Sequence, residues 1–251
     1  MADLINHPLI AERYFFPGGR APTSRLDVNV DDAVLACGVH RVDPDGFTVV
    51  FFHGNGEVVA DWQGTLDKIL GMLGWDLLLA EYRGYGGSTG QPLLGAMLDD
   101  VGAIIDAAGP PEKVVVMGRS VGSFFALEAV SRFPKIAGLI LESAIADPLE
   151  RLLLRVSPEE LGGSPEEIEA MQSRVDHQAK IGGYRGPTLI LHTRVDGLVD
   201  VSHAQRLKQW AGGDARLRIF DNGNHNSILW ENTNAYIDEI AALLARSRPR
   251  G

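Results

Sequence analysis

The sequence lacks several features that would assign it to particular protein classes. Of its 251 residues only Cys37 is a cysteine, so no disulfide can form within the chain and nothing indicates an oxidising compartment. No apolar run approaches the ~20 residues that a membrane-spanning helix needs. The N-terminus lacks the basic and then apolar segments of a secretory signal. We therefore expect a cytoplasmic protein without a stable membrane anchor.

Basic residues are fewer than acidic ones, and the sequence motifs of common metal sites are missing. The chain carries 23 lysines and arginines against 33 acidic residues, a formal net charge of −10 at pH 7. Such a surface repels nucleic acids, so we expect no nucleic-acid partner. Neither a His-Glu-x-x-His motif nor paired cysteines occur, so we expect no metal. The glycine-rich stretch 82–90 does not fit a dinucleotide-binding loop, because Thr89 occupies a required glycine position; we expect a structural loop held by an ion pair of Arg83, and no cofactor.

A strand, a tight turn and a helix around one serine are the strongest pattern that is present. Residues 114–117 form an apolar run typical of a buried strand, and a helical pattern begins at Val121. Between them, residues 118–122 match Gly-x-Ser-x-Gly with Ser120 at the centre. The turn strains the serine backbone, and the glycines let strand and helix pass closely. Ser120 is the candidate nucleophile; the alternative is a chance glycine-rich loop.

Strands alternate with helices along most of the chain, which predicts an α/β fold with a mostly parallel sheet and helices on both faces. Buried strands are expected at 47–52, 76–80, 137–141, 187–191 and 217–220, and helices at 58–73, 93–108, 202–211 and 227–246. Residues 11–50 are expected to be β, starting with a strand at 14–16. The length of the chain suits one domain, residues 1–251.

The stretch 143–186 interrupts this alternation. It holds three helix starts, at Asp147, Ser157 and Ser164, each with a proline next and a glutamate three residues after the capping residue. The first helix is rich in leucine, which favours an apolar acyl group in the substrate. Because the stretch follows the strand after Ser120, we expect a small helical cap above the site; an ordinary packed insert is the alternative.

A serine nucleophile needs a base, and the base needs an orienting acid. His225 is the candidate base, because it lies in a polar loop directly after a strand, at the sheet edge where Ser120 is expected. Asp196 is the candidate acid, near the tip of the loop after strand 187–191. Asp200 competes with it but is placed to cap the next helix, and Asp221 is an outside candidate.

An oxyanion produced by attack of the serine needs two N–H donors. One is expected from Val121, the residue after the nucleophile. The other is expected from Asn55 in the turn His53-Gly-Asn-Gly56, where glycines let the backbone approach a reacting carbonyl. A plain glycine turn is the alternative interpretation of this segment.

These motifs together resemble the α/β-hydrolase superfamily over about residues 11–246. The nucleophile, acid and base stand in the superfamily's order, and the most specific segments are His53-Gly54, Tyr82-Arg-Gly-Tyr-Gly86 and Gly118-Arg-Ser-Val-Gly-Ser123. They look like the branch of α/β-hydrolase domain-containing serine hydrolases that includes protein depalmitoylases and bacterial relatives. The resemblance implies eight strands, the second antiparallel.

The resemblance also implies an activity, the hydrolysis of carboxylic esters or thioesters through an acyl-enzyme intermediate. Two departures stand out. The acid loop opens His192-Thr193 where that branch has His-Gly, and the cysteine-rich membrane anchor of the depalmitoylases is absent. The second departure favours a small-molecule substrate. Two other functions stay open: a peptidase of related fold, and a non-catalytic binding protein.

Overall fold

The computed structural model describes residues 4–248, and its centre is an eight-stranded sheet in the order β1-β2-β4-β3-β5-β6-β7-β8. The strands are β1 (Arg25–Val30), β2 (Ala33–His40), β3 (Thr48–Phe52), β4 (Asp76–Ala80), β5 (Val114–Arg119), β6 (Gly138–Glu142), β7 (Thr188–Thr193) and β8 (Ala215–Phe220). Strand β2 is antiparallel to both neighbours, and the other pairings are parallel. The predicted sheet and its antiparallel second strand are confirmed.

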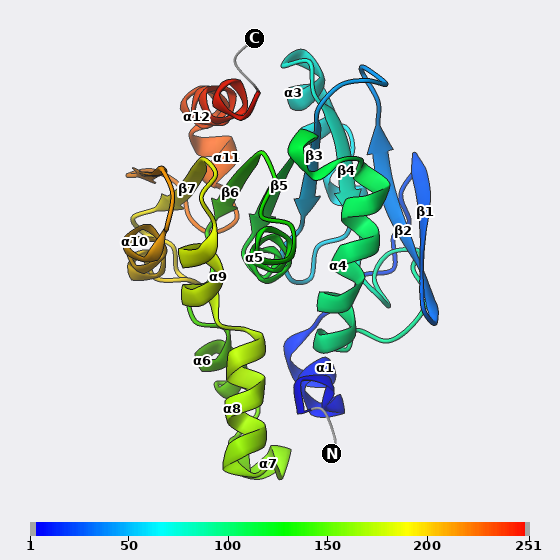
Figure 1. Cartoon of the computed structure of the whole chain (residues 1–251), viewed down its shortest axis with the longest axis vertical. Coiled ribbons are helices and arrows are strands. Elements are labelled where there is room, and N and C mark those ends of the chain that lie inside the picture. Colours follow the sequence, from blue (N-terminus) through cyan, green and yellow to red (C-terminus); the bar gives the residue numbers. More distant parts are fainter. Residues whose placement is uncertain (1–3, 249–251) are drawn as a thin grey trace.

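Helices pack against both faces of this sheet (Figure 1). They are η1 (Leu4–Asn6), α1 (Pro8–Tyr14), α2 (Val59–Trp62), α3 (Leu66–Met72), α4 (Leu94–Ala108), η2 (Pro111–Lys113), α5 (Gly122–Arg132), α6 (Pro148–Leu153), α7 (Pro158–Leu161), α8 (Pro165–Arg174), α9 (His177–Gly183), α10 (Val201–Trp210), α11 (Ile228–Glu231) and α12 (Thr233–Ser247). On β3, Val50 and Phe52 belong to the apolar layer of α4 and α5, whereas Val49 and Phe51 belong to that of α3 and α12. This alternation is that of a strand buried on both faces.

The N-terminal region differs from its prediction. A strand at 14–16 is wrong, because Tyr14 ends helix α1 and the next two residues are irregular. Local chemistry explains the helix. Pro8 occupies a first-turn position, and the His7 ring accepts a hydrogen bond from a first-turn N–H at 3.2 Å. Ile10 and Tyr14, four residues apart, are both buried.

Two helices that the sequence predicts as continuous are each divided in two. The segment 58–73 forms α2 and α3, separated by residues 63–65: Gln63 is extended, with ψ 138°, and Gly64 follows with a φ of +85°. The segment 227–246 forms α11 and α12, separated at Asn232, where φ is −128°. The side-chain amide of Asn232 donates to the carbonyl of Ile228 at 2.9 Å, which satisfies an acceptor at the break.

The glycine-rich loop 82–90 has the structural role that the sequence predicts. Arg83 donates two hydrogen bonds to Asp100, at 2.6 and 2.8 Å, and also pairs with Asp32. Arg83 and Asp100 are both at most 5% exposed, so the predicted buried ion pair is confirmed. It ties this loop to α4.

Four short helices, α6 to α9, lie between β6 and β7, and α6 to α8 extend beyond the sheet on the side of α1 (Figure 1). The three predicted helix starts are confirmed: the side chains of Asp147, Ser157 and Ser164 each accept a bond from the N–H three residues later. Helix α9, capped by Asp176, escapes prediction because its seven residues end in two glycines and show little periodicity.

A buried ion pair joins these helices to the body of the protein. Glu128 on α5 is 2% exposed and lies 2.7 Å from both the Arg174 guanidinium and the Lys180 ammonium. Breaking such a pair by removing one partner costs about 3–5 kcal/mol, because a charge is left buried and unpaired. The base of the insert is therefore fixed, on the end of α8 and on α9.

The neighbouring His177 on α9 is buried, and we expect it to make the stability of the fold depend on pH. Its Nδ1 lies 2.7 Å from the Ile145 carbonyl oxygen, and its ring packs edge-on against Phe124. Burial, with the charge of Lys180, lowers the pKa of His177 to about 3. Between about pH 6.5 and 3 the unfolded chain therefore binds more protons than the folded one, so stability falls as the pH falls.

Replacing this histidine should relieve the acid sensitivity. We expect His177→Asn, which keeps a donor near the position of Nδ1, to reduce the loss of unfolding free energy between pH 7 and 4 by about 3 kcal/mol. Urea titrations of wild type and variant at the two pH values measure this difference. An equal loss in both proteins would contradict the assignment of a neutral, buried ring.

Candidate active site

Ser120 lies in the sharp turn between β5 and α5, in a backbone conformation that is rare for a residue with a side chain. Its φ is 53°. A Cβ atom on Gly122 would lie 2.0 Å from the Phe52 carbonyl oxygen, and one on Gly118 would lie 2.6 Å from the Gly122 carbonyl oxygen. Both positions therefore require glycine. The N–H of Ser120 donates to the Glu142 carbonyl at 2.8 Å, which holds the strained turn against β6.

The structure brings together the three side chains that the sequence singles out. His225 Nε2 lies 3.0 Å from Ser120 Oγ, and His225 Nδ1 lies 2.8 Å from Asp196 Oδ2. Ser120 is 9% exposed, His225 is 5% exposed, and the Asp196 side chain has no exposed surface. These contacts are those needed for the ring to accept the hydroxyl proton while the carboxylate holds the other ring nitrogen.

The loop after β7 keeps Asp196 ionised and oriented. Its Oδ1 accepts hydrogen bonds from the N–H groups of Leu198 and Val199, at 2.9 and 2.8 Å. Burial acts to raise the pKa of Asp196, but the bonds from His225 and from this backbone lower it to about 2. His192 Nε2 lies 2.9 Å from the Val199 carbonyl oxygen and fixes the same turn.

The two competing carboxylates lie elsewhere. Asp200 caps α10 by accepting a bond from the Ser202 N–H at 2.9 Å, the structural role expected of it. Asp221 pairs with Arg194 at 2.8 Å on the exposed surface. Within residues 4–248, Asp196 is the carboxylate that bonds the His225 ring.

Within residues 4–248, two residues with unpaired backbone N–H groups line the cavity of Ser120. Asn55 and Val121 line the same cavity as Ser120, and among the described residues neither N–H has a hydrogen-bond partner. The Asn55 side chain is already engaged, because its Oδ1 accepts from the Phe16 N–H and from the Tyr85 hydroxyl, both at 3.0 Å. The side chain thus holds the turn in place, while the Asn55 N–H stays unpaired within the described residues.

Arg119, the residue directly before Ser120, contributes to the site but was not identified from the sequence. It is 4% exposed, and its guanidinium lies 2.6 Å from Glu57 and 3.0 Å from Glu142. It also donates to the His225 carbonyl oxygen at 2.8 Å, and Glu57 in turn accepts from the Gly54 N–H at 2.7 Å. One cation therefore connects the turn of Ser120 with the histidine loop and the 53–56 turn. The sequence feature that could have identified Arg119 is a charged residue at the end of an otherwise apolar strand.

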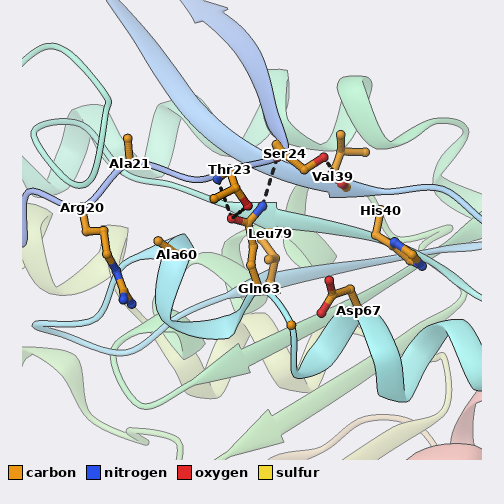
Figure 2. Close-up of a pocket in the computed structure, with 11 residues that line it drawn as sticks. Arg20, Ala21, Thr23, Ser24, Val39, His40, Ala60, Gln63, Asp67 and Leu79 are labelled. Carbon is orange, nitrogen blue, oxygen red and sulfur yellow. Dashed lines mark hydrogen bonds between the residues drawn. The ribbon is translucent and has the colours of Figure 1, made fainter.

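Ser120 and His225 open onto a cavity of about 610 Å³. A second cavity, of about 530 Å³, lies between β2 and the helices α2 and α3 (Figure 2). There the Gln63 amide already bonds the Thr23 N–H at 2.8 Å and the Ser24 carbonyl at 3.1 Å. The first cavity holds the histidine-bonded serine and is the candidate active site.

The described part of the chain shows neither a metal-ion cluster nor a membrane-spanning helix. Residues 4–248 hold no group of three or more His, Cys, Asp or Glu side chains arranged to bind a metal ion. Over the same residues, no helix has the length and apolar character required to cross a membrane.

Sequence comparisons find distant relatives. A family model described as the alpha/beta hydrolase fold matches residues 48–161. The chain is 25% identical over 186 residues to the uncharacterised protein YfhR of Escherichia coli K12, covering 71% of this chain and 62% of YfhR. It is 22% identical over 210 residues to the human phosphatidylserine lipase ABHD16A, covering 80% of this chain and 37% of that protein. The matches thus span less than two thirds of either relative.

Solved structures share the fold. The esterase Pf2001 of Pyrococcus furiosus superposes with a TM-score of 0.71 at 17% identity, covering 93% of this chain and 98% of that one. Est1E of Butyrivibrio proteoclasticus, solved with ferulic acid bound, gives a TM-score of 0.70 at 19% identity, with coverages of 88% and 99%. At these identities the likeness concerns the fold alone.

Proposed function

Because this chain belongs to the α/β-hydrolase superfamily, we propose that it is a serine hydrolase that cleaves carboxylic esters or thioesters. The observation that carries the proposal is the continuous hydrogen-bonded series Ser120–His225–Asp196, with distances of 3.0 and 2.8 Å, at the edge of a cavity. In this proposal Ser120 is the nucleophile, His225 the base and Asp196 the acid that orients the base.

The reaction proceeds in two halves. His225 Nε2 takes the proton of Ser120 Oγ as that oxygen attacks the ester carbonyl, and the oxyanion accepts bonds from the N–H groups of Asn55 and Val121. The carbon–oxygen or carbon–sulfur bond then breaks, and the histidine gives its proton to the leaving group. In the second half His225 deprotonates a water molecule, which attacks the acyl carbon. The bond from Ser120 Oγ to that carbon then breaks, His225 returns the proton to Oγ, and the acid leaves.

Residues 1–251 then form one hydrolase domain, with 143–186 as its cap. The cap contributes Leu154 to the cavity, and Phe16 and Leu198 add further apolar surface. These three side chains are 68%, 52% and 57% exposed, so an apolar part of a substrate would cover them. A small-molecule ester with an aliphatic portion fits this cavity best.

A substrate panel tests the reaction class. We expect p-nitrophenyl esters, and the matching thioesters, to be hydrolysed with kcat/KM at least 100-fold above that for aminoacyl p-nitroanilides. The anilides represent a peptidase, and the chain lengths within the ester series report the acyl preference. Faster hydrolysis of the anilides would favour a peptidase over an esterase. A folded wild-type protein that hydrolysed neither would favour a binding protein.

A further inference from the structure

We propose that the substrate also carries an anionic group, a carboxylate or a phosphate, which Arg151 and Arg155 bind. The proposal rests on the hydrolase function above, because both arginines line the cavity of Ser120. The whole chain has a formal net charge of −10, yet no aspartate or glutamate is among the described residues that line this cavity. A cavity with cations and no carboxylates, in an acidic protein, selects for negative charge.

The geometry of the cap places both guanidinium groups on the side of the cavity. Arg151 lies in the last turn of α6, and the N–H of Arg155 donates to the Leu152 carbonyl at 2.9 Å, which prolongs the turn. Side chains four residues apart on a helical turn share one face. Burial raises the pKa of Tyr14, another cavity residue, to about 12, and the charges of Arg151 and Arg155 both oppose that rise.

Neither arginine is neutralised by a carboxylate in the described part of the chain. Acidic residues near them in sequence are engaged elsewhere: Asp147 caps α6, Glu150 lies 3.7 Å from Arg206, and Glu160 lies 2.7 Å from Arg13. The third cavity arginine, Arg119, differs because it is already paired with two carboxylates. The charges of Arg151 and Arg155 are therefore available to a ligand.

Guanidinium groups bind carboxylates and phosphates through paired, charge-assisted hydrogen bonds. Because Leu154 lies between the two arginines in sequence and also lines the cavity, an aliphatic segment and an anion would contact the same wall. The substrate class that follows is an ester in which an apolar chain separates the scissile carbonyl from a terminal anion, on the acyl or the alcohol side.

Matched pairs of substrates test this class and distinguish the two anions. The carboxylate arm compares the mono-p-nitrophenyl half-esters of glutaric, adipic and suberic acid with their methyl-capped diesters. The phosphate arm compares 1-butyrylglycerol 3-phosphate with 1-butyrylglycerol by acid release. In at least one arm we expect wild type to prefer the charged member by about 10–100-fold in kcat/KM, a preference that added salt weakens.

Variants assign that preference to the two arginines. Arg151→Gln combined with Arg155→Gln should reduce the charged-to-neutral ratio of kcat/KM to near 1. The control is Arg218→Gln, which makes the same chemical change and removes one positive charge at an exposed position on β8, outside the cavity lining. A wild-type ratio near 1 in both arms, or a ratio that survives the double substitution, would overturn the proposal.

Binding without turnover separates this proposal from the hydrolase function. Calorimetric titration of the Ser120→Ala variant with monomethyl adipate and with glycerol 3-phosphate reports the anion site alone. Affinity for at least one of them that falls about 10-fold or more on adding the double arginine substitution supports the site. Affinities that the substitution leaves unchanged, or no binding of either probe, would refute it. If wild type hydrolyses no ester, the hydrolase proposal fails while the titration still decides the anion site.

Discussion

Replacing Ser120 with alanine is expected to lower kcat for a p-nitrophenyl ester by about 10⁴–10⁶-fold. The change removes the oxygen that His225 Nε2 contacts at 3.0 Å and leaves the N–H groups of Asn55 and Val121 in place. Alanine must adopt the same left-handed φ, but it keeps the backbone bond to Glu142, so we expect the fold to persist. Steady-state kinetics measures the loss of kcat, and circular dichroism measures whether the fold persists.

The same experiment can show whether the three side chains act as a unit. Ser120→Ala, His225→Ala and the double variant should retain about the same residual activity, because removing either group disables the same step. Asp196→Asn should cost about 10⁴-fold. The control is Ser131→Ala, the same chemical change at an exposed position on α5, which should leave kcat unaltered. Multiplicative losses in the double variant would contradict a shared step.

The second large effect is expected at Arg119. Replacing it with methionine removes the guanidinium that contacts Glu57, Glu142 and the His225 carbonyl, and leaves two carboxylates without their cation. We expect a loss of about 3–5 kcal/mol of unfolding free energy, the cost of an uncompensated buried charge. We also expect kcat to fall about 100-fold, because the loop of His225 and the 53–56 turn both lose the guanidinium that positions them.

A compensated variant separates positioning from stability. Adding Glu57→Gln and Glu142→Gln to Arg119→Met removes the unpaired charges, so stability should largely return while kcat stays low. Arg119→Lys should give intermediate kcat, since an ammonium cannot reproduce the planar set of donors. Unfolding titrations and steady-state kinetics on the same preparations provide both readouts. Recovery of kcat in parallel with stability would show that Arg119 acts through stability alone.

Much of the fold follows from the order of apolar runs. Runs such as 47–52 and 76–80 are too short for helices and too continuous for half-exposed strands, and the helices between them imply parallel pairing. The antiparallel β2 does not follow from periodicity and was expected only from the resemblance. The strand predicted at 14–16 was wrong because three adjacent aromatic residues carry no reliable period, whereas Pro8 and His7 determine a helix start.

The site, like the fold, contains residues that the sequence predicts and others that it does not. Ser120, Asp196 and His225 each follow a predicted strand, so topology alone brings them to one sheet edge. Arg119 could not be assigned, because its partners Glu142 and His225 come from other strands and loops whose approach depends on tertiary packing. The orientation of Arg151 likewise depends on how the cap is docked, which the buried Glu128 ion pair helps determine.

Labelling with a fluorophosphonate probe tests the central claim most directly. An activated serine oxygen attacks phosphorus, a bond from Oγ to phosphorus forms, and fluoride leaves. We predict that wild type gains the mass of one phosphonyl group, that the modified peptide carries it on Ser120, and that Ser120→Ala gains none. Folded wild-type protein that stays unmodified, or a label that persists in the alanine variant, would contradict an activated serine at this turn.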